Sequence, residues 1–157
     1  MGIDLPNELR GTVPSVNFYD RYFRKGGWNS LTIISLSIGQ GELGTTPMQM
    51  ANLASTIANR GFYYSPHIVK EIKGEQGINP KYTQKHRTTI DSVWFSHVVE
   101  GMDMAVNGPG AGGTAYNAAL PTIRVCGKTG TAQNPHGEDH SVFIAFAPKD
   151  DPKVAIA

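Results

Sequence analysis

The chain has 157 residues, with 14 lysines and arginines against 13 aspartates and glutamates. A formal net charge of +1 provides no electrostatic field for nucleic acid, so nucleic-acid binding is not expected. The single cysteine, Cys126, excludes a disulfide within the chain. A chain of this length can form one domain that buries about 70% of its unfolded surface.

The first predicted element is an aromatic segment near the N-terminus. Its rings are Phe18, Tyr19, Tyr22, Phe23 and Trp28, and the pair Gly26-Gly27 stands between Phe23 and Trp28. Packing of these rings in a core is the favoured interpretation. Ser15 precedes the segment, and we interpret it as a turn or helix-start residue rather than a catalytic serine.

Two helices are predicted in the middle of the chain. The first opens with a capping box of Thr46 and Gln49, has Pro47 at its first position and is ended by Gly61. Its apolar stripe consists of Met50, Leu53, Ala54, Ile57 and Ala58. The second helix runs from about Ser92 to Val106. Its apolar face consists of Phe95, Val98, Val99 and Met102. Both faces are predicted to lie in the core.

Three segments around these helices read as connections. Residues 64–72 are predicted to be a short extended stretch, and residues 74–85 a polar hairpin or loop. Residues 107–113 are rich in glycine, but no strand precedes them, as a dinucleotide-binding motif would require. A flexible connection from helix to sheet is therefore expected there.

The C-terminal third predicts three consecutive strands. The first carries the sequence 127–131, and a polar loop at 133–139 follows it. Residues 141–147 are apolar on both alternating faces, which is typical of a central strand covered on both sides. A last strand begins at Lys153. The fold class is therefore mixed α+β, with helices packed on an antiparallel sheet.

The sequence Gly127-Lys128-Thr129-Gly130-Thr131 carries the chemistry that points to function. Lys128 supplies a positive charge, Thr129 and Thr131 supply hydroxyl donors, and Gly130 leaves space for a ligand along the strand. A phosphate-binding loop would need a glycine where Thr122 stands, so nucleotide binding is disfavoured. A solvated lysine without a ligand remains the alternative for an isolated triplet.

A metal site and a cysteine nucleophile are both disfavoured. His136, Glu138, Asp139 and His140 could hold a metal, but they share one loop and lack partner ligands elsewhere, so solvated loop polarity is preferred. Cys126 lies in an apolar strand and is expected to be a small buried hydrophobe rather than a nucleophile. No metal and no cofactor are expected.

Several motifs in register carry a family resemblance. The segments 2–6 (Gly-Ile-Asp-Leu-Pro), 36–41 (Leu-Ser-Ile-Gly-Gln-Gly), 46–52 (Thr-Pro-Met-Gln-Met-Ala-Asn) and 127–133 (Gly-Lys-Thr-Gly-Thr-Ala-Gln) resemble successive signatures of class B penicillin-binding proteins. The segment 139–148 further resembles the elongation-type members. The resemblance runs from end to end of the chain, in order.

The resemblance implies a partial penicillin-binding, β-lactamase-like transpeptidase fold and a D,D-transpeptidase that forms an acyl-enzyme on serine. In that family the nucleophile lies in Ser-x-x-Lys, followed by Ser-x-Asn, both before the segment that matches 2–6. No Ser-x-x-Lys occurs in the chain, and Ser15-Val16-Asn17 lies on the wrong side of that segment. We therefore expect residues 1–157 to be the C-terminal portion of one transpeptidase domain, truncated at both ends and inactive alone.

The family also implies roles for the strand residues. Lys128 would act in catalysis through the electrostatics of the site, and Lys128, Thr129, Gly130 and Thr131 would bind substrate. The hydroxyls would bond the substrate carboxylate, and the Thr131 N–H would be one oxyanion donor. The implied partners are peptidoglycan stem peptides, β-lactam antibiotics and a membrane glycosyltransferase. The implied location is the periplasmic face of the bacterial inner membrane, with an anchor upstream.

Two alternatives stay open from the sequence. The strand could belong to a non-catalytic module that binds β-lactam or cell-wall peptide without acylation. A sheet edge left unprotected in the isolated chain would also invite pairing between copies, so an edge-strand dimer is possible.

Overall fold

The computed structural model describes residues 1–74, 77–110, 112–134 and 136–157. The loops predicted at 74–85, 107–113 and 133–139 each include residues outside these ranges. The chain divides into two compact units. The first contains residues 1–8, 47–130 and 142–157, and the second contains residues 9–46 and 131–141.

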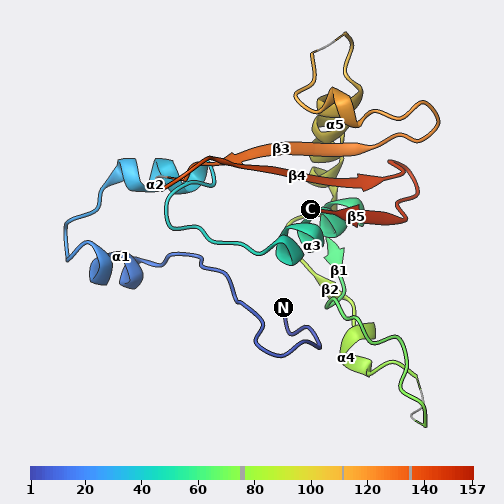
Figure 1. The fold of residues 1–157 in the computed structure, drawn as a ribbon, viewed down its shortest axis with the longest axis horizontal. Helices are drawn as coiled ribbons and strands as arrows, with labels where there is room; N and C mark the ends of the chain where they lie inside the picture. The colour runs from blue at the N-terminus through green and yellow to red at the C-terminus, as the bar shows by residue number, and fades with distance from the viewer. Residues whose placement is uncertain (75–76, 111, 135) are drawn as a thin grey trace. The chain divides into compact units, whose positions relative to one another are not determined.

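The three-stranded sheet follows the predicted order. Its strands are β3 (Cys126–Ala132), β4 (His140–Ala147) and β5 (Val154–Ile156), with β4 in the middle. The strands β3 and β4 run in opposite directions (Figure 1). The strands β4 and β5 pair antiparallel, with Ala145 opposite Ile156. The predicted meander is confirmed, and it leaves β3 at an edge of this sheet.

The two predicted long helices belong to the first unit. They are α3 (Pro47–Ala58) and α5 (Ser92–Asn107). Asp91 caps α5, because its carboxylate accepts a hydrogen bond from the N–H of Val93 at 3.0 Å. After α3 the chain turns at Gly61, whose φ of +102° favours glycine and whose N–H reaches the Thr56 carbonyl at 2.9 Å.

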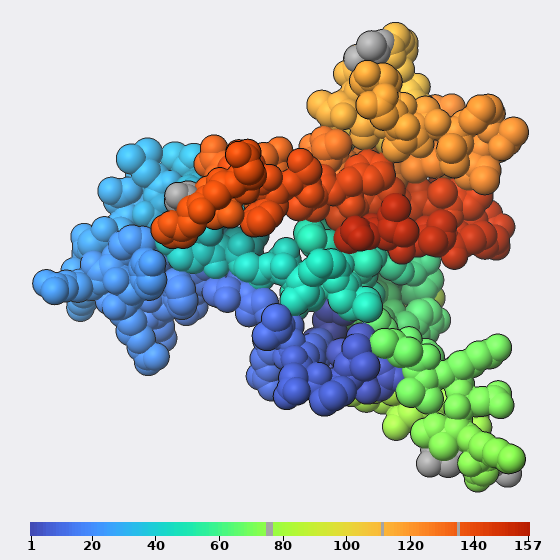
Figure 2. Space-filling view, viewed as in Figure 1, coloured from blue at the N-terminus to red at the C-terminus, as the bar shows by residue number. Residues whose placement is uncertain are grey.

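Two predicted core positions on these helices are wrong. Leu53 and Val98 are 52% and 45% exposed. Thr56 and Asp103 are buried in the same helices instead, and the Thr56 hydroxyl donates to the Asn52 carbonyl at 2.7 Å. The helix α3 lies against β5 (Figure 2), and the three residues that it buries, Ala54, Thr56 and Ala58, are all small, so this close packing leaves Leu53 in solvent.

Two buried clusters lie against the sheet of the first unit. One joins Ala58, Val99, Met102, Cys126 and Phe146, and the other joins Val106, Ala115, Val125 and Ala145. Ala145 and Phe146 are neighbours in β4 yet belong to different clusters, as expected when successive side chains point to opposite faces. The prediction of a doubly covered strand therefore holds for this pair, while His140 and Ser141 at the start of β4 are exposed.

The segment between α3 and α5 differs from its prediction. The strand β1 (Phe62–Tyr63) lies just before the predicted stretch and pairs antiparallel with β2 (His86–Arg87), and the segment between them contains the short helix α4 (Pro80–Thr83). Residues 64–72 themselves contain no strand. Asp4 holds part of this stretch, because its carboxylate accepts hydrogen bonds from the N–H groups of Ile68 and Val69 at 2.8–3.0 Å.

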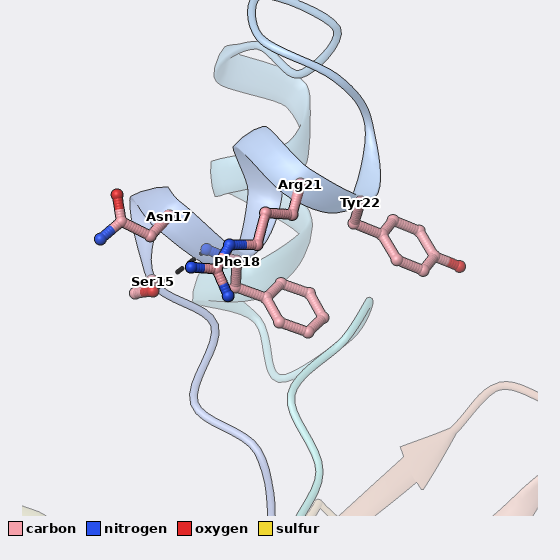
Figure 3. Close-up of a pocket in the computed structure, with 5 residues that line it drawn as sticks. All are labelled: Ser15, Asn17, Phe18, Arg21 and Tyr22. Atoms are coloured by element: carbon pink, nitrogen blue, oxygen red, sulfur yellow. Dashed lines mark hydrogen bonds between the residues drawn. The ribbon is translucent and has the colours of Figure 1, made fainter.

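The second unit contains the helices α1 (Val16–Tyr22) and α2 (Ser30–Ser37). Ser15 is the N-cap of α1, and its hydroxyl accepts a hydrogen bond from the Phe18 N–H at 3.2 Å (Figure 3). The aromatic rings contact one another as predicted, but their burial is not general. Tyr19 is 2% exposed, whereas Tyr22 is 65% exposed. Among the helices of the described ranges, none is long and apolar enough to cross a membrane.

Candidate functional site

The candidate site is the edge strand β3. Lys128, Thr129, Gly130 and Thr131 follow one another along it, and all but the half-buried Thr129 are exposed. The strand is anchored at its start by Val125 and Cys126, which are buried. The structure therefore fixes one end of this sequence in the core and presents the other end to solvent.

Lys128 has its ammonium group close to its own strand. Its Nζ donates a hydrogen bond to the Thr129 carbonyl at 2.6 Å. Within the described part of the chain, no carboxylate lies at ion-pair distance from Lys128. An ammonium group has three donors, so two remain for an anionic ligand.

Thr129 is held by Thr114, which the sequence did not single out. The two hydroxyl oxygens are hydrogen-bonded at 3.0 Å. Thr114 follows Gly113, where an added Cβ would lie 2.2 Å from the Ala105 carbonyl oxygen, and the Ala115 N–H bonds the same carbonyl at 2.9 Å. The glycine therefore lets this backbone pack directly on α5 and places Thr114 beside the strand. Only the glycine pair 112–113 could have suggested this contact.

The two glycines around Lys128 have different surroundings. A Cβ added at Gly127 would lie 2.5 Å from the Phe143 ring, so packing requires glycine there. A Cβ added at Gly130 would meet Val142 Cβ at 3.7 Å, an ordinary contact. The φ of Gly130 also lies outside the left-handed region. Neither the packing of the described residues nor the backbone conformation therefore requires glycine at position 130.

A buried ion network supports the start of β3. Asp103 is 2% exposed and accepts hydrogen bonds from Arg124 and Lys149 at 2.8–3.1 Å. Asn107 bridges Asp103 and the Val125 carbonyl at 2.8 and 2.7 Å. Burial alone would raise the pKa of Asp103, but hydrogen bonds from Arg124, Lys149 and Asn107 outweigh it and lower the pKa to about 2.

Cys126 lies inside the core next to this network. It is fully buried, and burial raises the pKa of its thiol to about 11. A thiol in this state is a poor nucleophile, so the interpretation of Cys126 as a small core residue is confirmed.

The polar loop after β3 shows hydrogen bonds within itself. Asp139 accepts from the Asn134 N–H at 3.0 Å, and the Asn134 side chain accepts from the His136 N–H at 3.1 Å. Over the described ranges, no group of three or more histidine, cysteine, aspartate and glutamate side chains is placed to hold a metal ion.

Gln40 lies in the segment 36–41 that resembles the family, but no role of its own was predicted for it from the sequence. Its side chain bonds the Thr131 carbonyl and the Gln133 N–H, both in the second unit. The flanking residues Gly39 and Gly41 were the signal that could have marked it.

The family model of the penicillin binding protein transpeptidase domain matches residues 1–157. Among curated relatives, the peptidoglycan D,D-transpeptidase MrdA of Acinetobacter baumannii is 30% identical over 99% of this chain and 25% of its own length. The protein of the same name from Haemophilus influenzae is 31% identical over 99% of this chain and 26% of its own length. The chain therefore spans about a quarter of the length of these relatives.

Solved structures agree with the sequence relatives. The crystal structure of Pseudomonas aeruginosa PBP2 in complex with WCK 5153 matches with a TM-score of 0.81 and 32% identity, over 98% of this chain and 34% of that one. PBP2 from Helicobacter pylori matches with a TM-score of 0.77 and 29% identity, over 99% of this chain and 27% of that one. The imipenem acyl-enzyme of penicillin-binding protein A from M. tuberculosis matches with a TM-score of 0.62 and 31% identity, over 78% of this chain and 27% of that one. The chain therefore belongs to the penicillin-binding protein transpeptidase domain family.

Proposed function

We propose that this chain is the C-terminal portion of the transpeptidase domain of a peptidoglycan D,D-transpeptidase, and that β3 is the wall of its active site that receives the substrate carboxylate. The observation that carries the proposal is the exposed edge sequence Lys128 to Thr131. Its ammonium group has no carboxylate partner among the described residues, and Gly130 leaves room above the strand.

The roles of the strand residues follow from their chemistry. A stem peptide ends in a D-alanine carboxylate, and β-lactams carry an anionic group in the equivalent place. Lys128 attracts that group, and the hydroxyls of Thr129 and Thr131 donate hydrogen bonds to it. The Thr129 hydroxyl has a single hydrogen, which it donates to the Thr114 oxygen in this structure, so it donates to the substrate carboxylate when Thr114 instead donates to Thr129. The contact between the two hydroxyls restricts the Thr129 side chain in either direction.

The covalent step uses a serine of the parent protein. The serine of a Ser-x-x-Lys motif attacks the substrate carbonyl, the peptide bond to the terminal D-alanine breaks, and D-alanine leaves with the serine proton on its amine as the acyl-enzyme forms. The Thr131 N–H donates to the developing oxyanion beside the N–H of that serine. Loss of one such donor costs on the order of 10²-fold in rate. An acceptor amine then takes the acyl group, which completes the cross-link.

The test is acylation of the parent protein by a labelled penicillin, followed by intact-mass spectrometry. We expect a stoichiometric adduct on the serine of Ser-x-x-Lys in the parent and a large loss of acylation rate in Lys128→Ala. Saturable binding of the penicillin to the parent without a covalent adduct would reject acyl transfer and favour the non-catalytic binding module.

The cellular setting belongs to the same proposal. We place the parent protein at the periplasmic face of the inner membrane, with a membrane peptidoglycan glycosyltransferase as partner. The support is the resemblance to the elongation-type members and the names of the relatives, which are peptidoglycan transpeptidases. Protease accessibility of the domain in spheroplasts tests the location, and co-purification of a glycosyltransferase tests the partner.

A further inference from the structure

The side-chain amide of Gln40 lies along the edge of β3 in the second unit. Its Nε2 donates to the Thr131 carbonyl at 3.0 Å, and its Oε1 accepts from the Gln133 N–H at 3.4 Å. A residue in a parallel neighbouring strand makes the same pair of bonds, to a carbonyl and to the N–H two residues further on. One side chain therefore takes the place of a strand neighbour at this point of the edge.

The turn that carries Gln40 is built to present it. Gly39 and Gly41 have φ values of +82° and +72°, in the left-handed region that glycine adopts without strain. The N–H groups of Gly39 and Gln40 bond the carbonyls of Leu36 and Ser35 at 3.0 and 3.1 Å and so close the end of α2. A Cβ added at Gly39 would meet no atom within 4 Å, so the positive φ, and not packing, is the reason for a glycine at this position.

Gln40 contacts Thr131, the residue whose N–H donates to the oxyanion in the proposed mechanism. In a β-strand the N–H and the carbonyl of one residue point to the same edge. The Thr131 N–H therefore faces the edge on which Gln40 holds the Thr131 carbonyl. An oxyanion donor acts only when it lies about 2.7–3.1 Å from the position of the developing charge. A misplacement of about 1 Å can cost about 10²-fold in rate.

We propose that Gln40 is a positioning residue for acyl transfer, whose amide holds the backbone of Thr131 in the orientation that its N–H needs in the transition state. The proposal rests on the proposed function of β3. Gln40 acts through Thr131 and Gln133, so its loss should reduce the rate of the chemical step more than the affinity for the ligand.

The test uses Gln40→Met in the parent protein, because methionine keeps the length of the side chain and loses both hydrogen bonds. Stopped-flow acylation by a fluorescent penicillin separates the noncovalent Kd from the acylation rate constant. We expect the rate constant to fall by about 10-fold, with Kd and Tm close to those of the unsubstituted protein. Gln84→Met is the matched control, since Gln84 is an exposed glutamine at the end of α4. A rate constant equal to that of the control overturns the proposal.

Gln40→Glu provides a second, independent readout. An ionised carboxylate can accept from the Gln133 N–H but cannot donate to the Thr131 carbonyl, whereas a protonated carboxyl can do both. The rate constant of the variant, relative to the unsubstituted protein, should therefore rise as the pH is lowered and the introduced carboxyl takes up a proton. Glu42 and Asp139 line the same pocket as Gln40, and their negative charges should raise the pKa of that carboxyl.

The outcomes separate the two proposals. A defect in Gln40→Glu that does not change with pH, or a defect in Kd or Tm alone, overturns the positioning role. Absence of any adduct in the unsubstituted parent protein rejects the proposed function itself, and with it this inference. Normal acylation of the parent protein with no defect in either variant rejects only the inference.

Discussion

Replacement of Asp103 by asparagine should destabilise the first unit by about 2–3 kcal/mol. The side chain of Asp103 is 3% exposed, and its carboxylate accepts from Arg124, Lys149 and Asn107. Removal of one partner from a buried ion pair typically costs about 3–5 kcal/mol. The value expected here lies at or below the lower end of that range, because the Arg124 side chain is 58% exposed and stays hydrated without its partner.

The pKa of Asp103 gives a second route to the same magnitude. Its fall from 3.8 to about 2 corresponds to about 2 kcal/mol of preference for the charged form. Because the pKa is lower in the folded state, this contribution is present above about pH 4 and is lost as the pH falls towards 2. The difference in stability between the two proteins should therefore stay constant at neutral pH and shrink between pH 4 and pH 2.

Urea unfolding followed by circular dichroism measures the effect. With a slope of about 2 kcal/mol per molar urea, the midpoint of Asp103→Asn should fall by about 1 M. Glu100→Gln is the matched control, because Glu100 pairs with the same Lys149 at 2.7 Å but its side chain is 61% exposed. Exposed pairs contribute about 0–1 kcal/mol. Equal shifts for the two variants, or a gap that persists at pH 2, would refute the reasoning.

Further outcomes are expected for three variants of the 127–130 segment and for the isolated chain. Gly127→Ala should cost about 1–3 kcal/mol by urea unfolding, because its Cβ would collide with Phe143. Gly130→Ala should change the free energy of unfolding by less than about 1 kcal/mol and yet weaken penicillin binding by the parent protein. Equal binding by the two proteins would contradict the proposal that Gly130 leaves space for the ligand. Lys128→Ala should lower the second-order rate constant for acylation of the parent protein by about 10²-fold. Because salt screens the attraction between the ammonium group and an anionic ligand, added salt should lower this rate constant in the unsubstituted protein but not in the variant. The isolated chain 1–157 should gain no mass with a β-lactam, and an adduct on any serine would contradict this. Light scattering should show the isolated chain associating through its sheet edge as its concentration rises, and a constant monomer mass would contradict that expectation.

Local sequence patterns were sufficient for the elements around the site. The proline and glycine at the ends of α3, the apolar residues on both faces of 141–147 and the short polar loops act within a few residues of the chain, so the helices α3 and α5 and the three-strand order could be predicted. The same holds for Ser15 as a cap and for the burial of Cys126. The sequence 127–131 and the family motifs also predict that Lys128, Thr129, Gly130 and Thr131 lie on one strand.

The tertiary structure alone decided which side chains support that strand. Gln40 and Thr131 are 91 positions apart, and Asp103 and Lys149 are 46 apart, so no local periodicity links them. The prediction that Leu53 is buried was wrong for a related reason. A helical period defines a stripe of candidates, but the approach of β5 to α3 determines which of them lose contact with water. Propensities and turn preferences act between neighbours in sequence, whereas burial and ion pairing depend on neighbours in space.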